Sequence, residues 1–400
     1  MSEINITESK EKESLFHEII RLLKENVRSY MMYIALVVIM IFFNFMTKGA
    51  FLTAMNITNL INQAGYVAVL AIGMTIILIL VQIDLSIGFV AGFSGAIAAI
   101  LMTQYNISEW VAIPIVALIG LAIGTYQGLI VTRLSVPAFV TTLAGMFIFR
   151  GALSLSLQKT GTIIIPNAGF NALSNGSIVD PTEGHLITIA IGVIGIILVF
   201  IAMINARRNK VKYNFQVTSL PIFVVELVAI AVVVMVIITR LASFNGLPWT
   251  AVIVGVILLG YNFMLNKTKL GRAIYGIGGN AQAAELSGIN VKRVMMFAFC
   301  SMGTLAAIAG ILFTSRLQSA TPTAGTGFEM DAIASSYIGG VAVSGGIGKV
   351  TNTIIGTLVI MSLTNGMNLM GVDISWQYVV KGIIFIIAVA FDIRSRNMAK

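Results

Sequence analysis

Long apolar runs separated by short polar breaks dominate this chain of 400 residues. A helix needs about 20 mainly apolar residues to cross the hydrocarbon core of a bilayer, so runs of this length predict membrane-spanning helices. The pattern indicates segments at 31–47, 57–82, 84–103, 110–132, 138–157, 185–205, 217–239, 246–265, 294–314, 331–348, 350–370 and 377–392. We therefore predict an all-α polytopic membrane protein with about ten to twelve transmembrane helices, some of them short, broken and glycine-rich.

The first thirty residues follow a different pattern. Apolar residues recur there at helical spacing and form one face of a helix: Leu15, Phe16, Ile19, Ile20, Leu23 and Val27. Such a face is typical of a helix lying at the membrane interface. The absence of a small-residue cleavage site argues against a secretory signal peptide. The predicted organisation is an amphipathic N-terminal arm at 1–30, a single transmembrane domain at 31–393 with a loop at 266–293, and a tail at 394–400.

Composition and charge support a membrane protein and orient it. Hydrophobic residues make up 58% of the chain and charged residues 10%, whereas soluble chains average about 25% charged residues. With the N-terminus inside, nineteen of the 25 lysines and arginines fall on inside segments and four outside, while Arg150 and Lys381 lie within spans. Because positively charged loops stay on the cytoplasmic side, both termini and the loop at 266–293 are predicted to be cytoplasmic.

Two predicted spans, 84–103 and 331–348, are rich in glycine and begin with acidic residues. A carboxylate near membrane depth is costly unless it caps a helix or faces water or a partner. Asp84 therefore has two open interpretations: the N-cap of a helix, with Ser86 adding a donor, or a place in a transport path. The glycines favour close helix packing.

The loop Lys267–Arg293 is a basic island between apolar segments. Asn280 can cap a short helix over 281–287, and Gly288 can supply its left-handed stop. The G-I-G-G run at 276–279 predicts a loop before this helix. A short capped helix between two spans indicates a docking surface, and the alternative is a solvated basic loop.

The chain lacks the residues that disulfides, metal sites and ATP-binding loops require. Cys300 is the only cysteine, so disulfides and thiolate metal sites are excluded. His17 and His185 are the only histidines, and no H-E-x-x-H run or G-x-x-x-x-G-K-S/T run occurs. We therefore predict no catalytic residue, no metal site and no ATP site in this chain.

Uncharged polar residues within the spans suit a path for a neutral polar solute. They are Asn62, Gln63, Thr141, Thr142, Ser154, Asn365 and Asn368. Each can instead join helices to one another. Lys381 and Asp392 in the last span leave a proton-coupled carrier open, although Lys381 can equally snorkel toward Trp376.

Ordered motifs over about residues 50–393 resemble the permease subunits of bacterial monosaccharide ABC importers. They are Q-I-D-L-S-I-G-F-V-A-G, V-P-A-F-V-T-T-L-A-G-M-F-I-F-R-G, G-R-A-I-Y-G-I-G-G-N-A-Q-A-A-E-L-S-G-I-N-V, S-R-L-Q-S-A-T-P-T-A-G, E-M-D-A-I-A-S-S-Y-I-G-G, G-G-I-G-K-V, N-G-M-N-L-M and W-Q-Y-V-V-K-G. The chain looks closest to the long xylose or multiple-sugar type, because 158–245 is longer than in ribose-type permeases.

The resemblance implies partners. Two copies of the chain would form the path, a separate polypeptide with two fused ATPase domains would bind ATP, and an extracytoplasmic sugar-binding protein would deliver substrate, with no nucleic-acid partner. The family's coupling helix maps by motif onto this island, so the implied ATPase contacts are Asn280, Ala283, Ala284, Glu285, Leu286 and Gly288. Arg316, Gln318 and 321–327 are candidates for contact with the binding protein.

The implied activity is import of a monosaccharide, xylose or a related pentose or hexose, across the bacterial cytoplasmic (inner) membrane. Candidates for the sugar path are Phe139, Thr141, Thr142 and Asn365. The alternative from another class is a stand-alone channel or secondary carrier for a small neutral polar solute.

Overall fold

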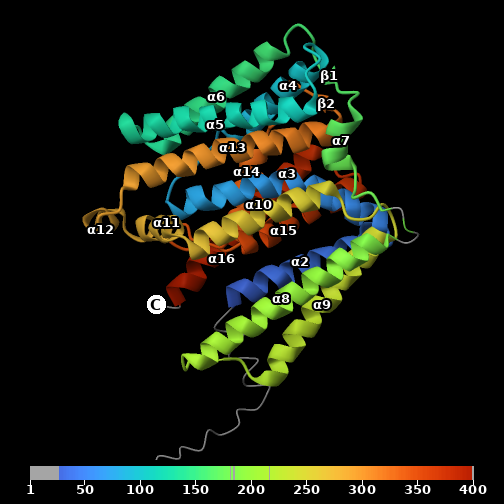
Figure 1. The fold of residues 1–400 in the computed structure, drawn as a ribbon, viewed down its shortest axis with the longest axis vertical. Coiled ribbons are helices and arrows are strands. Elements are labelled where there is room, and N and C mark those ends of the chain that lie inside the picture. The colour runs from blue at the N-terminus through green and yellow to red at the C-terminus, as the bar shows by residue number, and fades with distance from the viewer. Residues whose placement is uncertain (1–26, 181, 183–184, 216, 399–400) are drawn as a thin grey trace, which may run out of the picture.

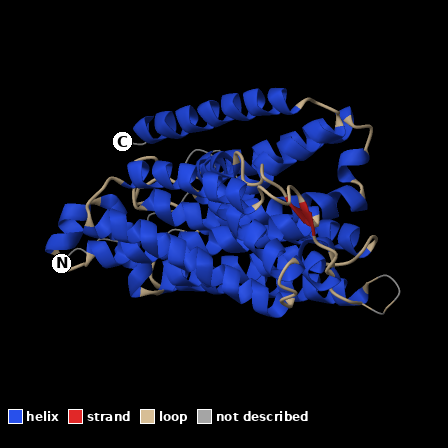
Figure 2. Cartoon of the chain, turned by 90° about the horizontal axis from the view of Figure 1, so that it is seen from above, coloured by secondary structure: helices blue, strands red, loops and turns tan. Residues whose placement is uncertain are grey.

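The structure is a computed structural model that describes residues 27–398 except 181, 183–184 and 216. It confirms the all-α prediction: Figure 2 shows a helical bundle, with a small antiparallel pair of strands, β1 (Ile163–Ile164) and β2 (Ser319–Ala320). Residues 1–26 of the predicted amphipathic arm lie outside the described range.

Each predicted span overlaps a helix. These helices are α2 (Val27–Met46), α3 (Ala54–Ile79), α4 (Ile87–Thr103), α5 (Glu109–Arg133), α6 (Ala138–Ser156), α8 (Leu186–Lys212), α9 (Leu220–Ala242), α10 (Trp249–Lys267), α13 (Val291–Leu317), α14 (Phe328–Ile338), α15 (Val350–Leu369) and α16 (Ile374–Met398). Shorter elements are η1 (Ala50–Leu52), α7 (Ala168–Asn175), α11 (Lys269–Gly279) and α12 (Ala281–Leu286). Among the described residues, eight helices are long and apolar enough to cross a membrane.

The prediction of one continuous span at 331–348 is wrong. α14 has 11 residues and ends at Ile338, so it is about 16 Å long, roughly half the thickness of the hydrocarbon core. An irregular segment follows at 339–349, in which Gly340, Gly345 and Gly346 adopt positive φ angles. A right-handed helix cannot continue through such residues, and the glycines therefore build a loop.

The bundle has two ends, named here for the short helices that lie there (Figure 1). At the α12 end, α3 stops beside α11 and α13 begins directly after α12. At the α7 end, β1 pairs with β2 and α7 packs against α13. Hence α3 and α13 run in opposite directions through the bundle.

Helices α3–α6 and α13–α16 are two similarly built groups of opposite direction. In each group a long helix is followed by an irregular segment and then by a shorter helix, α4 or α14. The long helix α3 packs against α14 and α15, and α13 packs against α4 and α5. The two short helices begin close together, since a Cβ added at Gly88 would lie 2.3 Å from the Gly325 carbonyl oxygen. Transporters commonly place their sites at paired broken helices of this kind.

This arrangement means that 321–327 is not simply a surface loop. Pro322, Thr323 and Thr326 are exposed, but Ala324 and Gly325 are buried against the start of α4. Only part of this segment is therefore open to a binding protein.

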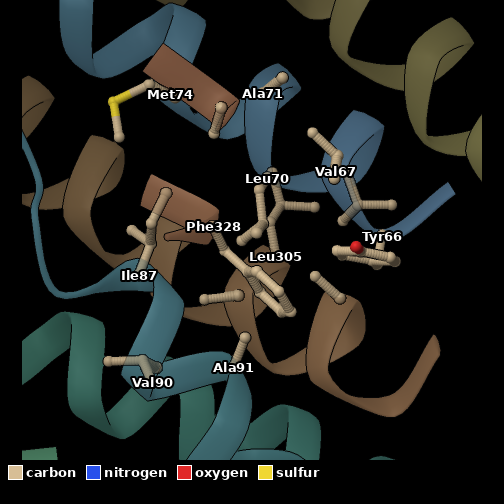
Figure 3. Close-up of a cluster of buried hydrophobic side chains, with 14 of the residues drawn as sticks. Tyr66, Val67, Leu70, Ala71, Met74, Ile87, Val90, Ala91, Leu305 and Phe328 are labelled. Atoms are coloured by element: carbon tan, nitrogen blue, oxygen red, sulfur yellow. The ribbon is translucent and has the colours of Figure 1, made fainter. Parts of the chain in front are cut away.

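The apolar core lies where the two groups cross. Figure 3 shows Tyr66 and Leu70 of α3 beside Ile87 of α4, Leu305 of α13 and Phe328 of α14. The rings of Tyr66 and Phe328 are 4.7 Å apart between centroids. These helices therefore form the rigid centre of the bundle.

The α8–α9 hairpin lies at the edge of the bundle (Figure 1). Its two helices pack chiefly against each other, with Gly192 of α8 facing Ile238 of α9. Most of their apolar side chains are exposed, which suits helices surrounded by lipid.

Candidate functional site

The helix α12 forms as the sequence predicts. The Asn280 side chain accepts a hydrogen bond of 2.9 Å from the Ala283 amide, and this bond caps the first turn. After Leu286 the chain turns at Gly288, whose φ is +83°, and its amide donates to the Glu285 carbonyl. The cap and the left-handed glycine hold six residues as an isolated helical turn and a half.

The prediction of a loop before α12 is wrong, because the G-I-G-G run is the end of the helix α11. The Thr268 hydroxyl accepts from the Gly271 amide and caps the start of this helix. Ile274 and Ile277 are buried at helical spacing, and this apolar stripe holds the glycines in a helix despite their low helix propensity.

The predicted ATPase contacts on α12 differ in exposure. Asn280, Ala283, Glu285 and Gly288 are exposed, and Leu286 is 84% exposed. Ala284 is 6% exposed because its methyl group packs into this chain, so its side chain offers little surface to a partner, and contact of Ala284 with the ATPase stays a prediction. Leu286, by contrast, is an exposed apolar side chain on a loop whose other exposed residues include Lys267, Lys269, Arg272, Lys292 and Arg293.

The end of α11 is joined to the bundle through backbone contacts. A Cβ added at Gly278 would lie 1.9 Å from the carbonyl oxygen of Ile79, the last residue of α3. The same oxygen accepts a hydrogen bond of 2.9 Å from the Gly346 amide. We call these three residues, Ile79, Gly278 and Gly346, the glycine junction. It connects α11, α3 and the segment between α14 and α15.

Tyr275 strengthens the same connection. Its hydroxyl donates a hydrogen bond of 2.7 Å to the Gly348 carbonyl. Burial raises the pKa of the Tyr275 hydroxyl above its ordinary value, so the hydroxyl keeps its proton and remains a donor. The sequence contained the glycines of this junction but no signal of which segments they join.

The Asp84 carboxylate does not cap α4. The helix begins at Ile87, Ser86 occupies the N-cap position, and no side chain accepts the amides of the first turn. Instead, Asp84 Oδ1 accepts from the Ser86 amide at 2.9 Å and the Ser86 hydroxyl at 2.7 Å. The Gln127 amide on α5 donates to the same hydroxyl at 2.7 Å. The prediction of an N-cap is therefore wrong, because the chain makes a tight turn after Asp84 before the helix starts.

The structure separates the predicted path residues. The Thr142 hydroxyl donates to the Ile83 carbonyl at 3.1 Å, so it lies beside the segment that contains Asp84. Thr141 is buried, while Phe139 is 52% exposed. Asn365 lies elsewhere, and its side-chain oxygen accepts a hydrogen bond of 2.9 Å from the Asn56 amide.

Lys381 has a partner that sequence reasoning missed. Its Nζ lies 2.9 Å from Asp331 Oδ1 and 3.0 Å from Oδ2, so it does not extend toward Trp376. The two residues are fifty positions apart, and no local pattern pairs them. This ion pair joins α14 to α16 inside the bundle.

Known proteins resemble this chain over most of its length. Residues 56–169 and 162–389 match the family described as branched-chain amino acid transport system / permease component. The xylose transport system permease protein XylH of Haemophilus influenzae is 37% identical over 93% of this chain and 98% of its own. The protein of the same name from Escherichia coli K12 is 36% identical over 92% of both chains.

The ribose import permease protein RbsC of Escherichia coli K12 is 32% identical over 86% of this chain and 87% of its own. No solved structure matches. Because the family match covers nearly all of the bundle, and relatives above 30% identity cover most of the chain, this protein belongs to the family of transport-system permease components.

Proposed function

We propose that this chain is the membrane-spanning subunit of an ATP-binding-cassette importer for a monosaccharide, xylose or a related pentose or hexose. The names of its relatives, which include xylose and ribose permeases, support the substrate class. The observation that carries the proposal is α12, an exposed, capped helix whose base is fixed to the bundle at the glycine junction. A stand-alone channel has no need of such a helix.

An ATPase polypeptide with two fused domains docks on the exposed face of α12. Leu286 fills an apolar cleft of that partner, and Glu285 meets a basic group. Asn280, Ala283 and Gly288 allow close approach because their side chains are short. ATP binds and is hydrolysed on the partner, and this chain supplies no catalytic group.

The glycine junction carries movement of α12 into the membrane. When ATP closes the partner domains, α12 and α11 move together, because Asn280 is both the C-cap of α11 and the N-cap of α12. Tyr275 in turn ties α11 to Gly348. Backbone contact at Ile79 and Gly346 then displaces the end of α3 and the segment that joins α14 to α15. These helices belong to opposite groups of the bundle, so their displacement shifts the balance between two permease conformations.

Two copies of the chain form the path in the bacterial inner membrane, with the α12 end in the cytoplasm. A sugar-binding protein delivers substrate at the α7 end. Phe139, Thr141, Thr142 and Asp84 belong to one candidate stretch of this path, beside the broken α3–α4 connection. Asn365 belongs to another.

The test is co-expression of the chain with its ATPase, followed by co-purification and by ATP-dependent uptake of radiolabelled xylose. Leu286→Arg places a charge on the proposed contact. Leu134→Arg is the matched control, since Leu134 is 71% exposed at the same end of the bundle but outside the island.

We expect Leu286→Arg to abolish co-purification and uptake while Leu134→Arg preserves both. Retention of the ATPase by Leu286→Arg would place the contact elsewhere. Uptake by the chain alone, without ATP, would identify a channel or secondary carrier and overturn the proposal.

A further inference from the structure

A cavity of about 450 Å³ lies between α3, α14, α15 and α16. Its volume falls within the range of roughly 300–1,000 Å³ that is typical of small-molecule sites. The lining combines a charged pair, amides and aromatic rings, including Asp331, Asn368, Gln377, Tyr378 and Lys381. We call this space the α14–α16 cavity. It lies apart from the glycine junction and from Asp84.

The charged pair keeps access to the cavity. The side chains of Lys381 and Asp331 are 18% and 14% exposed although they bond to each other. Removing two charges from water costs several kcal/mol for each, and apolar residues of similar volume often stabilise a buried site better. Ionisable residues inside a membrane bundle therefore indicate function. Here the Asp331 carboxylate offers hydrogen-bond acceptors, and the Lys381 ammonium offers donors, to a molecule bound in the cavity.

Neutral polar groups extend this surface. The Gln377 side-chain amide donates a hydrogen bond of 2.7 Å to the Asn368 oxygen and another of 2.9 Å to the Val372 carbonyl. These bonds fix the side chains of Gln377 and Asn368. The Thr364 hydroxyl donates to the Ile360 carbonyl, and its oxygen keeps acceptor capacity. Donors and acceptors thus line one side of the cavity.

Aromatic rings supply the other kind of surface. Tyr66 and Phe328 form a tilted pair at the inner wall, and Tyr378 and Phe385 come from α16. A sugar ring has hydroxyl groups at its edge and C–H groups on its faces, so it needs both kinds of surface. An acyl chain would leave the ion pair and the amides without use.

The charge balance selects the class of ligand further. Asp331 is already neutralised by Lys381, so the pair carries no net charge toward a cation or an anion. A neutral polyhydroxylated molecule can bond to both partners without separating them.

We propose that the α14–α16 cavity holds a neutral sugar of monosaccharide size during transport, with Asp331 accepting from its hydroxyl groups and Lys381 and Asn368 contributing donors. This inference rests on the proposed importer function and gives that function a substrate site. This site differs from the path candidates named from the sequence. Only Asn365 among them is near the cavity residues in sequence, and its side-chain oxygen accepts a hydrogen bond from Asn56.

Protection of a single cysteine tests the site in the complete transporter. In a Cys300→Ala background, Met330→Cys places a thiol on the cavity lining. Met55→Cys is the matched control, because Met55 and Met330 are both 59% exposed and Met55 lies on α3 outside the cavity. The complex of permease, ATPase and binding protein is reconstituted in liposomes and treated with a small water-soluble methanethiosulfonate, with and without D-xylose.

We expect D-xylose to slow modification of Met330→Cys and to leave Met55→Cys unchanged. At a sugar concentration about four times the dissociation constant, the slowing is about fivefold, following 1 + [L]/Kd. Mannitol serves as the solute control, after uptake measurements establish that the same complex does not transport it.

Variants separate a sugar contact from a structural ion pair. The double variant Asp331→Asn with Lys381→Gln removes both charges, and we expect it to assemble but to lose protection and uptake. If this variant fails to assemble, Asn368→Leu removes a cavity amide without touching the ion pair and is expected to weaken protection.

Uptake by the unmodified complex is measured in the same liposomes. Uptake without protection at Met330→Cys, or assembled variants that keep normal protection, would overturn the cavity proposal while the importer function stands. Absence of ATP-dependent sugar uptake in the unmodified complex would instead overturn the importer function.

Discussion

The amide of Gly346 donates a hydrogen bond of 2.9 Å to the carbonyl oxygen of Ile79, which joins a loop near the C-terminus to the end of an early helix. Gly278 packs against the same oxygen. This relationship brings three distant segments of the chain together directly behind α12. It makes the glycine junction a direct connection between α11, which precedes the exposed helix, and the end of α3 in the bundle.

Gly278→Ala is predicted to uncouple the ATPase from transport. The new Cβ would lie 1.9 Å from the Ile79 oxygen, so the backbone has to move apart. A coupling loss of about 1–3 kcal/mol corresponds to about a 5–150-fold fall in transport. We measure both sugar uptake and co-purification with the ATPase. We expect co-purification to persist, because α12 is unchanged.

Gly279→Ala is the matched control for this substitution. A Cβ at Gly279 meets nothing within 4 Å, although the residue is the next one along the chain. We expect normal uptake. An equal loss in both variants would show that helix propensity, and not the junction, causes the defect.

Asn56 and Asn365 are predicted to act as a structural pair. Their side chains share a buried bond of 2.9 Å, and the Asn56 amide also donates to the Phe51 carbonyl. Removing Asn56 therefore leaves the Asn365 oxygen without this donor, at a cost of about 1–3 kcal/mol. The loss of stability is measured by thermal unfolding of purified Asn56→Leu, Asn365→Leu and the double variant. We expect the double variant to be more stable than the sum of the single losses indicates.

The same cycle tests the path interpretation of Asn365. Additive losses, together with a specific fall in uptake for Asn365→Leu, would place Asn365 in the sugar path. Recovery of uptake in the double variant would support the structural pair.

Asp84 is predicted to organise the turn before α4. Asp84→Ala removes the acceptor of both Ser86 bonds, and we expect a loss of about 1–3 kcal/mol in stability. Asp84→Asn keeps an oxygen and is expected to lose less. Normal thermal stability with abolished uptake in Asp84→Asn would instead indicate a direct role in the path.

The α12 end is predicted to be cytoplasmic. In a Cys300→Ala background, Thr160→Cys lies exposed at the α7 end and Ser287→Cys lies exposed at the α12 end. We expect a membrane-impermeant maleimide to label only Thr160→Cys in intact cells and both variants in lysed cells. Labelling of Ser287→Cys alone in intact cells would reverse the orientation.

The sequence by itself determined the features that depend on neighbouring residues. Runs of apolar residues predicted the spans, because a segment is stable across the bilayer when it is long enough and apolar enough by itself. Asn280 and Gly288 predicted the ends of α12, because caps act through residues three or four positions away. The ordered motifs likewise pointed to the permease family.

Tertiary structure decided what depends on distant residues. The glycines at 276–279 have low helix propensity, and burial of Ile274 and Ile277 against the bundle holds them in a helix. The positive φ angles after α14 shortened the predicted span at 331–348. Asp331 became the partner of Lys381 only when α14 and α16 packed together, because a contact across fifty residues leaves no period in the sequence.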